Sequence, residues 1–423
     1  MTMKLHAPSR RELLLASGVL FAWAHLPRVA LAEGRDPRLL VIVLRGALDG
    51  LAAVAPVGDP DWLRLRGDNA LTLQGTPAAL PLDSFFALNP AMPNLHRLYR
   101  AGQAGIVHAV ASPYRERSHF DGQDVLESGL TKPGAVDSGW LNRALAALAP
   151  AGHVGGRQAF AVGPVTPLLV RGSAPVLSWT PPRLPPATDD TVMRLIDLYN
   201  HTDPVLARAL EEHVGLTAIA RAGGIEMAPG KSPPGQGAAP KAPPVPGAQV
   251  RAFFAESAGA AAKFMARDDG PRIGALAFDG WDTHAAEGAG NGRLFALLGA
   301  LDGALGSVES GMGAAWQQTA VVAITEFGRT ARINGTEGTD HGTATVALLA
   351  GGAVKGGRVI ADWPGLSAAS LYEGRDLKAT TDLRAILKGL LRDHLRVDER
   401  ALAETVFPGS AAVKPASGLV VTA

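Results

Sequence analysis

Short apolar runs alternate with longer amphipathic stretches along most of this 423-residue chain. The clearest run, Arg38 to Leu44, is apolar on both faces, which is typical of a central parallel strand. Similar short runs predict strands at 105–111, 158–162, 168–171, 273–278, 320–324, 345–349 and 358–360. Periodicity and end signals predict helices at 94–101, 118–127, 189–222, 250–266, 294–316 and 381–395, the last with Thr380 or Thr381 as N-cap.

The alternation of strands and helices predicts an α/β fold with one central, parallel or mixed but mostly parallel sheet flanked by helices. The pattern lies on both sides of a Pro- and Gly-rich stretch at about 230–247. We therefore expect a single domain over residues 33–423, with that stretch as a flexible surface insertion. Its composition buries too little apolar area to offset the entropy of ordering, so limited proteolysis should cut near Lys231 or Lys241.

The first residues have the features of an export signal. Ser9-Arg10-Arg11-Glu12 is a twin-arginine pattern, a weakly apolar stretch follows at 13–26, and Ala30-Leu31-Ala32 is a small-x-small cleavage site. We expect residues 1–32 to be a Tat signal peptide, and the mature chain to begin at Glu33 in the periplasm or outside the cell. The alternative is an uncleaved amphipathic helix that acts as an anchor. No other segment reaches the ~20 apolar residues of a spanning helix, so we expect no membrane span in the mature chain.

Composition narrows the chemistry. The chain has no cysteine, which excludes disulfides and metal–thiolate sites. The expected signal carries four basic residues against Glu12, a net +3, so its removal changes the net charge from +1 to −2. A chain of this charge has no electrostatic footprint for nucleic acid, and we expect no nucleic-acid partner.

Three polar clusters lie at the predicted strand ends. Asp282 and His284 follow the strand at 273–278, Glu326 follows 320–324, and Asp340 with His341 precedes 345–349. In open α/β sheets, sites form outside the carboxyl ends of the strands. Carboxylate and imidazole together suit a divalent metal: zinc, manganese, calcium and magnesium are not distinguished, and polar loop tips without metal are the alternative. We predict that Asp49, Asp282, His284, Glu326 and His341 converge on one pocket, with Ser118 at its rim.

Asp49, Glu326 and the Asp340–His341 pair each have two interpretations. Asp49 follows the first strand in a Gly-rich turn, as a metal ligand or as a turn cap. Glu326 is a ligand, or it pairs with Arg329 and binds no metal. Adjacent side chains in extended backbone point apart, so we favour His341 as a ligand and Asp340 as its hydrogen-bonding partner or a ligand to a second ion.

Two further loops carry candidate chemistry. Arg45 either holds an anionic group or pairs with a nearby carboxylate. Ser118 is either the N-cap of the helix at 118–127 or a nucleophile set where backbone amides favour an anion, with Ser112 after the same strand as the other candidate. His119 and Asp121 are ligands or orient this loop.

These motifs, in this order, resemble the bacterial family called domain of unknown function 1501. The stretches that carry the resemblance are 44–51, 117–124, 280–284, 325–330 and 338–342. The family is similar to the alkaline phosphatase/sulfatase superfamily, which implies Asp and His ligands beside a hydroxyl nucleophile. By position, the resemblance implies Asp49, Asp282, His284, Glu326 and His341 as ligands and Ser118 as nucleophile. Phe327 follows Glu326 where a ligand histidine is expected, which implies one ion or none in place of two.

Two functions remain open from the sequence. One is an exported metal-dependent hydrolase acting on a small anionic ester or on a sulfated or phosphorylated glycan. The other is a non-catalytic periplasmic binding protein that reuses the strand-end pocket of an alkaline phosphatase-like fold. A converged ligand set favours the hydrolase, whereas a pair between Glu326 and Arg329 that fills the pocket favours the binding protein.

Overall fold

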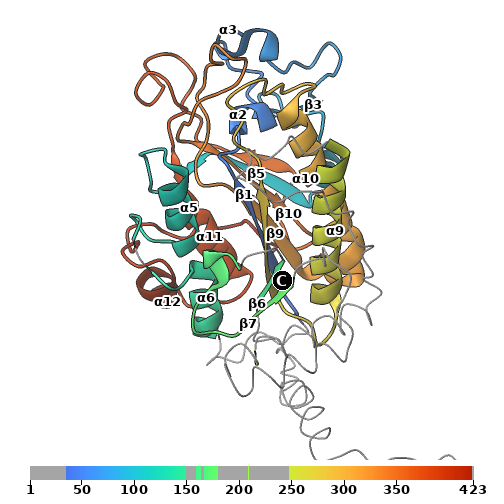
Figure 1. Ribbon diagram of the computed structural model, residues 1–423, viewed down its shortest axis with the longest axis vertical. Helices are drawn as coiled ribbons and strands as arrows, with labels where there is room; N and C mark the ends of the chain where they lie inside the picture. Colours follow the sequence, from blue (N-terminus) through green and yellow to red (C-terminus); the bar gives the residue numbers. More distant parts are fainter. Residues whose placement is uncertain are drawn as a thin grey trace, which may run out of the picture.

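A mixed, mostly parallel β-sheet crosses the middle of the molecule, with helices on both faces (Figure 1). The computed structural model describes residues 35–134, 136–148, 159–162, 166–179, 208 and 247–421. The predicted fold class is confirmed by this arrangement. The described residues do not include the expected signal at 1–32, and they include only residue 208 of the predicted helices at 189–222 and residue 247 of the insertion at 230–247. Those expectations stay predictions.

Within the described residues the main sheet has the order β11-β5-β10-β9-β1-β8-β6-β7, and β12 pairs with β5. Its strands are β1 (Arg38–Arg45), β5 (Ala104–Ala111), β6 (Ala159–Val162), β7 (Val176–Trp179), β8 (Ile273–Asp279), β9 (Thr319–Ile324), β10 (Thr345–Ala350), β11 (Arg358–Ile360) and β12 (Thr381–Asp382). A small antiparallel sheet is formed by β2 (Val54–Ala55), β3 (Leu80–Pro81) and β4 (Ala87–Leu88).

Strand direction determines which loops meet. β1 is parallel to β8 and β9, whereas β10 is antiparallel to both β9 and β5. The carboxyl ends of β1, β5, β8 and β9 therefore lie on one edge together with the amino end of β10. As a result, the loops that follow β8 and β9 and the loop that precedes β10 share this edge.

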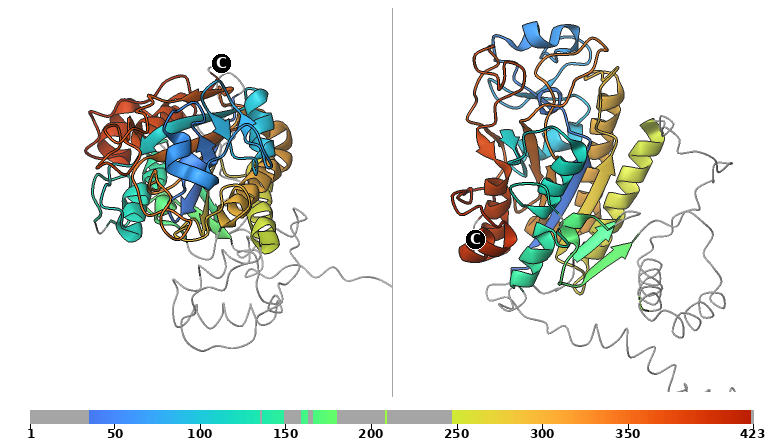
Figure 2. Two further views of the ribbon diagram at one scale, coloured as in Figure 1. Left: turned by 90° about the horizontal axis from the view of Figure 1, so that it is seen from above. Right: turned by 60° about the vertical axis from the view of Figure 1, so that its left-hand side comes forward.

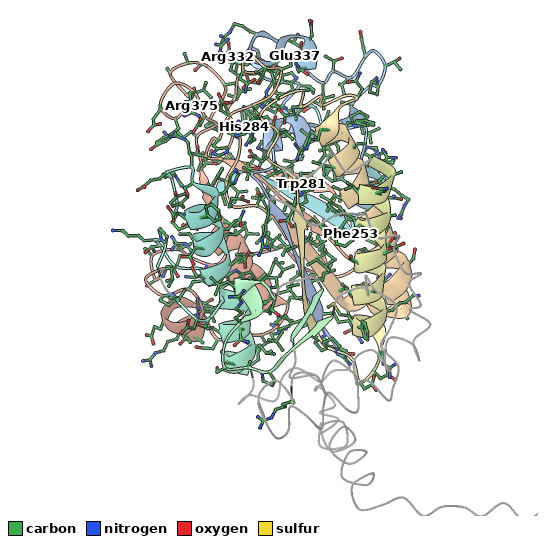
Figure 3. All side chains as sticks on the ribbon, in the orientation of Figure 1. Phe253, Trp281, His284, Arg332, Glu337 and Arg375 are labelled. Carbon is green, nitrogen blue, oxygen red and sulfur yellow. The ribbon has the colours of Figure 1, made fainter. Side chains whose placement is uncertain are left out.

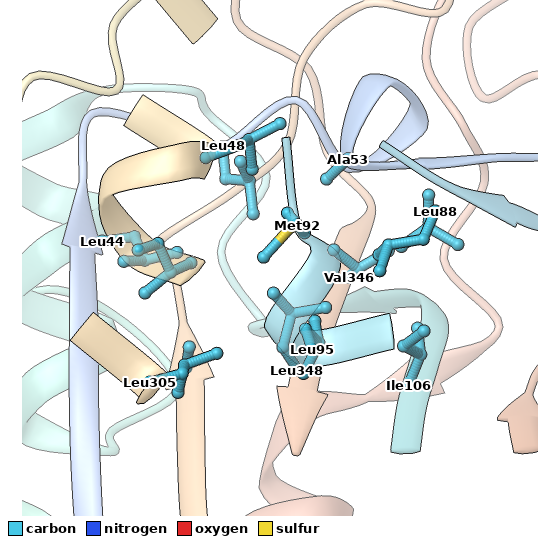
Figure 4. Packing of buried hydrophobic residues seen from close by; sticks show 14 of the residues in the cluster. Leu44, Leu48, Ala53, Leu88, Met92, Leu95, Ile106, Leu305, Val346 and Leu348 are labelled. Carbon is cyan, nitrogen blue, oxygen red and sulfur yellow. The ribbon is translucent and has the colours of Figure 1, made fainter. Parts of the chain in front are cut away.

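The buried faces of β1 explain the layering. Leu40, Ile42 and Leu44 belong to a core cluster with residues of α4, α9 and α10, and some of its members are shown in Figure 4. Leu39 and Val43 belong to a second cluster with residues of α6 and α11 on the opposite face. Burial of each such side chain stabilises the fold by roughly 1.5–3 kcal/mol. Because alternate side chains of β1 belong to different clusters, the strand links both cores. The two helical layers are visible on either side of the sheet in Figure 2.

The helices and short helical turns complete the layers. The α-helices are α2 (Gly50–Ala53), α3 (Trp62–Arg66), α4 (Pro93–Arg100), α5 (His119–Ser128), α6 (Trp140–Leu148), α9 (Gly247–Ala266), α10 (Arg293–Met312), α11 (Leu383–Asp393) and α12 (Glu399–Ala401). Short 3-10 turns are η1 (Gly67–Asn69), η3 (Leu168–Val170) and η4 (Gly313–Gln318), and η5 (Leu402–Val406) is a π-turn. Within the described residues, no helix combines the length and apolarity needed to cross a membrane.

Three local predictions were wrong. Residues 168–170 form the turn η3 and not the predicted strand. The prediction failed because an apolar run of this length is compatible with either structure. Strand β7 was not among the predicted strands. Helix α11 begins at Leu383, and Asp382 is its N-cap, since its carboxylate accepts from the Arg384 amide at 2.8 Å.

Candidate metal centre

The loop after β8 is held against the loop after β1. Trp281 donates its backbone N–H to the Arg45 carbonyl at 3.2 Å. Gly46 has a φ of +118°, and a Cβ there would lie 2.5 Å from the Asp282 nitrogen. Only glycine permits this close approach without displacing the backbone. The Arg45-Gly46 motif therefore fixes the position of Asp282 and His284.

Glu326 follows β9 and is fully buried. Its Oε1 accepts from the Gly46 amide at 2.8 Å and from Gln123 Nε2 at 3.2 Å, and it lies 2.9 Å from His119 Nδ1. His119 and Gln123 are four residues apart on α5 and so reach the same carboxylate. Burial would raise the pKa of Glu326, but these hydrogen bonds, above all the one from His119, hold it below its usual value.

His341 approaches from the loop before β10. Its Nδ1 lies 2.8 Å from the carbonyl of Arg117, the residue that precedes the N-cap of α5. Arg117 has a φ of +62°, a left-handed conformation that costs a non-glycine residue on the order of 1 kcal/mol or more. This strained backbone therefore presents a hydrogen-bond acceptor to a candidate ligand.

Three histidines surround the Asp282 carboxylate. His119 Nε2 lies 3.5 Å from Oδ2, while His341 Nε2 and His284 Nε2 lie 3.3 and 3.1 Å from Oδ1. The two Nε2 atoms of His284 and His341 are only 3.0 Å apart. One ligand atom from each of His119, Asp282 and His341 lies within 4.8 Å of the other two. We call Asp282 and the three histidines, His119, His284 and His341, the Asp282 cluster.

The hydrogen-bond partners of the three Nδ1 atoms determine whether each Nε2 atom carries a proton or a free lone pair. Nδ1 of His119 faces Glu326, that of His341 faces the Arg117 carbonyl, and that of His284 lies 3.4 Å from Asp340 Oδ1. Each of these partners is an acceptor, which assigns the proton of a neutral ring to Nδ1. The three Nε2 atoms all face the Asp282 carboxylate, and a cation among them, either a metal ion or a proton, would satisfy this arrangement.

The donor set fits a divalent metal. Nε2 of His119 is buried and has no hydrogen-bond partner within the described residues, as expected of an atom placed for an ion. Imidazole and carboxylate are the ligands that zinc uses in the absence of cysteine, and ligating histidines donate their other N–H to carboxylates or carbonyls. His119, Asp282 and His341 would hold the ion, with the exposed His284 on the solvent side.

Without a metal, a proton takes the place of the cation. The Asp282 and Glu326 carboxylates on either side of the ring raise the pKa of His119 to about 9. Burial would raise the pKa of Asp282, but His119, His341 and Arg329 together hold it far below its usual range. The cluster therefore attracts positive charge strongly.

Arg329 forms a salt bridge with Asp282 and not with Glu326. Its buried guanidinium donates to Asp282 Oδ1 at 2.7 Å, and also to the side chain and carbonyl of Thr339. Thr339 in turn donates to the buried Glu287 at 2.9 Å. The expected alternative of a Glu326–Arg329 pair is not present, because the two side chains are committed to different partners.

Asp49 lies outside the cluster. Its carboxylate caps α2 through the amides of Leu51 and Ala52, and it forms a fully buried salt bridge with Arg66. Burial would raise the pKa of Asp49, but Arg66 holds it below its usual value. Burial and the Asp49 charge raise the pKa of neighbouring Glu287 to about 8. The geometry of Asp49 is thus that of the cap weighed in the sequence analysis.

The remaining predicted residues lie around the cluster. Arg45 pairs with the buried Glu127, and Asp121 accepts from the Tyr114 hydroxyl at 3.3 Å. Ser118 is the N-cap of α5 by position, but its side chain makes no capping hydrogen bond. Ser112 is buried and donates to the Glu326 carbonyl at 3.2 Å. Of the two serines, Ser118 is the more accessible.

Sequence reasoning missed several residues that build this site. Gln123 was recoverable, because it lies one helical turn after His119. The roles of Thr339 and of the Arg117 carbonyl could not be predicted from the sequence. Every residue has a backbone carbonyl, and threonine is common in loops. Figure 3 labels His284 at the end of the molecule that carries the cluster, well above Trp281 and Phe253.

The fold and this cluster define an α/β protein with a candidate metal centre at the carboxyl edge of its sheet. Residues 36–406 match the model of the family described as Protein of unknown function (DUF1501). The chain belongs to that family, which confirms the resemblance noted in its motifs. Among curated proteins, none matches the sequence significantly.

Several solved structures are similar at low identity. The phosphonate monoester hydrolase of Agrobacterium radiobacter is 14% identical, with a TM-score of 0.36 over 86% of this chain and 74% of that one. Ps i-CgsB in complex with k-i-k-neocarrahexaose is 11% identical, with a TM-score of 0.35 over 90% and 77%. The C-terminal periplasmic domain of EcEptC from Escherichia coli, in complex with Zn, is 12% identical, with a TM-score of 0.28 over 75% and 74%. The activities of these three proteins are not attributed to this chain.

Proposed function

We propose that this chain is an exported metal-dependent hydrolase of phosphate or sulfate esters. The observation that carries the proposal is the convergence of three histidine Nε2 atoms on the Asp282 carboxylate. A bound divalent ion supplies Lewis-acid polarisation of an ester oxygen and activates an oxygen nucleophile. The substrate class is a small anionic ester or a sulfated or phosphorylated glycan.

The residues of the chain have separable roles in this proposal. His119, Asp282 and His341 hold the ion, and Arg329 fixes the Asp282 carboxylate at 2.7 Å. Ser118 is the candidate nucleophile, because it directly precedes His119 at the start of α5 and its side chain is not used as a cap. The first-turn amides of this ten-residue helix favour an anion at the same place.

The alternative is a non-catalytic periplasmic binding protein. A salt bridge between Glu326 and Arg329 that closes the pocket would favour it. Arg329 instead bonds to Asp282 and Thr339, and Glu326 bonds to His119. No observation at the Asp282 cluster therefore favours this second function, and the hydrolase is retained.

Export rests on the first 32 residues, which lie outside the described residues. The twin arginines and the Ala30-Leu31-Ala32 site support passage through the Tat machinery to the periplasm or beyond. N-terminal sequencing of the exported protein should begin at Glu33. Export that is undiminished after Arg10→Lys and Arg11→Lys together would contradict the route.

Metal analysis of the full protein tests the central claim. The purified wild type should contain close to one zinc or manganese ion per chain and should hydrolyse nitrophenyl phosphate or nitrophenyl sulfate. His119→Ala and Asp282→Ala should lose metal and rate together. His96→Gln is the matched control, because it removes a histidine that bonds to the Pro81 carbonyl outside the cluster. Metal content that neither cluster variant changes would end the proposal.

A further inference from the structure

A cleft of about 210 Å³ lies beside the Asp282 cluster. Its lining residues are Leu65, Thr330, Arg332, Ile333, Asn334, Asp340, Leu371, Gly374 and Arg375. Figure 3 labels Arg332, Arg375 and His284 at the same end of the molecule. The cleft is smaller than the roughly 300–1,000 Å³ of typical small-molecule pockets, so it suits one part of a larger substrate.

The walls of the cleft contact the cluster directly. Asp340 lies 3.4 Å from His284 Nδ1, and Asn334 Nδ2 donates to the His284 carbonyl at 3.0 Å. Arg375 donates to the His341 carbonyl on the other side. A group bound in the cleft would therefore sit next to His284 and His341, two of the three histidines that face Asp282.

The charges of the cleft favour an anion. Arg332 is exposed, and within the described residues its guanidinium has no hydrogen-bond or ion-pair partner. Arg375 adds a second guanidinium, 40% exposed, whose nearest carboxylate is Asp376 at 3.3 Å. The carboxylate in the wall, Asp340, is already bonded by Asn334 at 3.1 Å. Among the lining residues, two guanidinium groups therefore stand against one engaged carboxylate, and Arg332 is the one without an anionic partner, because Arg375 pairs with the buried Asp376. Guanidinium matches the oxygens of sulfate, phosphate or carboxylate.

The other walls favour a ring. Leu65 and Leu371 are buried apolar side chains on this lining, and Ile333 is half-buried. Apolar walls with a few polar groups are typical of sites that bind the face of a ring and read its substituents. The cleft thus combines an apolar surface with an available cation.

We propose that this cleft is a specificity subsite for a second anionic substituent, carried on a ring next to the ester bound at the Asp282 cluster. The inference rests on the proposed hydrolase function, because it assigns the preferred substrate: an ester on a ring that bears two anionic groups. Arg332 makes the ion pair with the second group, and Arg375 supports it while holding His341.

Calorimetry with the metal-loaded full chain tests the subsite without turnover. The probes are benzenesulfonate and meta-benzenedisulfonate, whose carbon–sulfur bonds an ester hydrolase does not cleave. The disulfonate should bind about tenfold more tightly, as expected for one added charged hydrogen bond. Arg332→Ala should abolish this preference and leave the monosulfonate affinity unchanged. Arg332→Lys should retain part of the preference, since the charge stays but the planar fork is lost.

The matched control is Arg400→Ala, which removes the same charge from an arginine whose side chain is 82% exposed and pairs with Glu404. It should keep the preference for the disulfonate. Equal affinity of the wild type for both probes, or an Arg332→Ala variant that keeps the preference, overturns the subsite. If the preference behaves as expected but no phosphate or sulfate ester is hydrolysed, the subsite stands and the hydrolase function fails.

Discussion

Raising the pH should destabilise the metal-free protein through His119. Its imidazole lies between Glu326 at 2.9 Å and Asp282 at 3.5 Å, which raises its pKa from 6.5 to about 9. Because the folded state holds this proton more tightly than the unfolded chain, the stabilisation is fully present below about pH 6.5. It is lost as the pH rises through about 9.

The size of the effect follows from the pKa change. At about 1.36 kcal/mol per pH unit, the change from 6.5 to about 9 sets an upper limit of about 3.4 kcal/mol. The His119 side chain is 24% exposed and Asp282 is 41% exposed, so solvent screens part of the attraction. We therefore expect the free energy of unfolding to fall by about 2 kcal/mol between pH 6.5 and 9.5.

Denaturant unfolding of chelator-treated protein, followed by circular dichroism at several pH values, measures this loss. His119→Gln should remove the pH dependence assigned to this group, and Glu326→Gln should reduce it. Gln123→Met is the matched control, because it deletes a neutral hydrogen bond to the same Glu326 oxygen at 3.2 Å and should keep the wild-type slope. A wild-type profile identical to that of His119→Gln would refute the placement of His119 between two carboxylates.

Three further variants separate ligand, support and scaffold. Asp49→Asn should lower the free energy of unfolding by about 3–5 kcal/mol, because it leaves the Arg66 guanidinium buried without its charged partner. The bound metal per chain should stay unchanged. Loss of metal at retained stability would instead identify Asp49 as a ligand. Glu326→Gln should weaken zinc about 10–100-fold in a chelator competition, since the acceptor of His119 loses its negative charge. An unaltered affinity would contradict this support. Gly46→Ala should lower both metal content and hydrolytic rate, because its Cβ would meet the Asp282 nitrogen at 2.5 Å, and a wild-type rate would show that the loops can separate freely.

The sequence identified most of the sheet but not the partners within the site. Strands such as β1 and β9 are continuous apolar runs, and burial on both faces is the physical reason that they stand out. The loops were located because carboxylates and imidazoles at strand ends need partners. Which partner each one takes depends on distances across the fold, and so the sequence left Arg329 open between Glu326 and other groups, whereas it bonds to Asp282.

Asp49 illustrates the same limit. An aspartate in a Gly-rich turn has the same local pattern whether it binds metal or caps a helix. Arg66, seventeen residues later, decides the matter by forming a buried salt bridge, and nothing in the local sequence links the two. His119 was recognised only as a ligand or a loop-orienting residue, because its place in the cluster depends on how α5 packs against the loop after β9.

The reversed strand β10 has a consequence for the order of assembly. It lies between β5 and β9 and brings His341 to the edge just before it enters the sheet. A nascent chain that ends before this strand also lacks β11 and β12, so β5 would have no partner strand, β9 would be paired with β1 alone, and His341 would not be held at the Asp282 cluster. An ion held by the cluster, as proposed above, would then bind only after synthesis has passed residue 350 and β10 has joined the sheet, so it would not serve as a nucleus for folding.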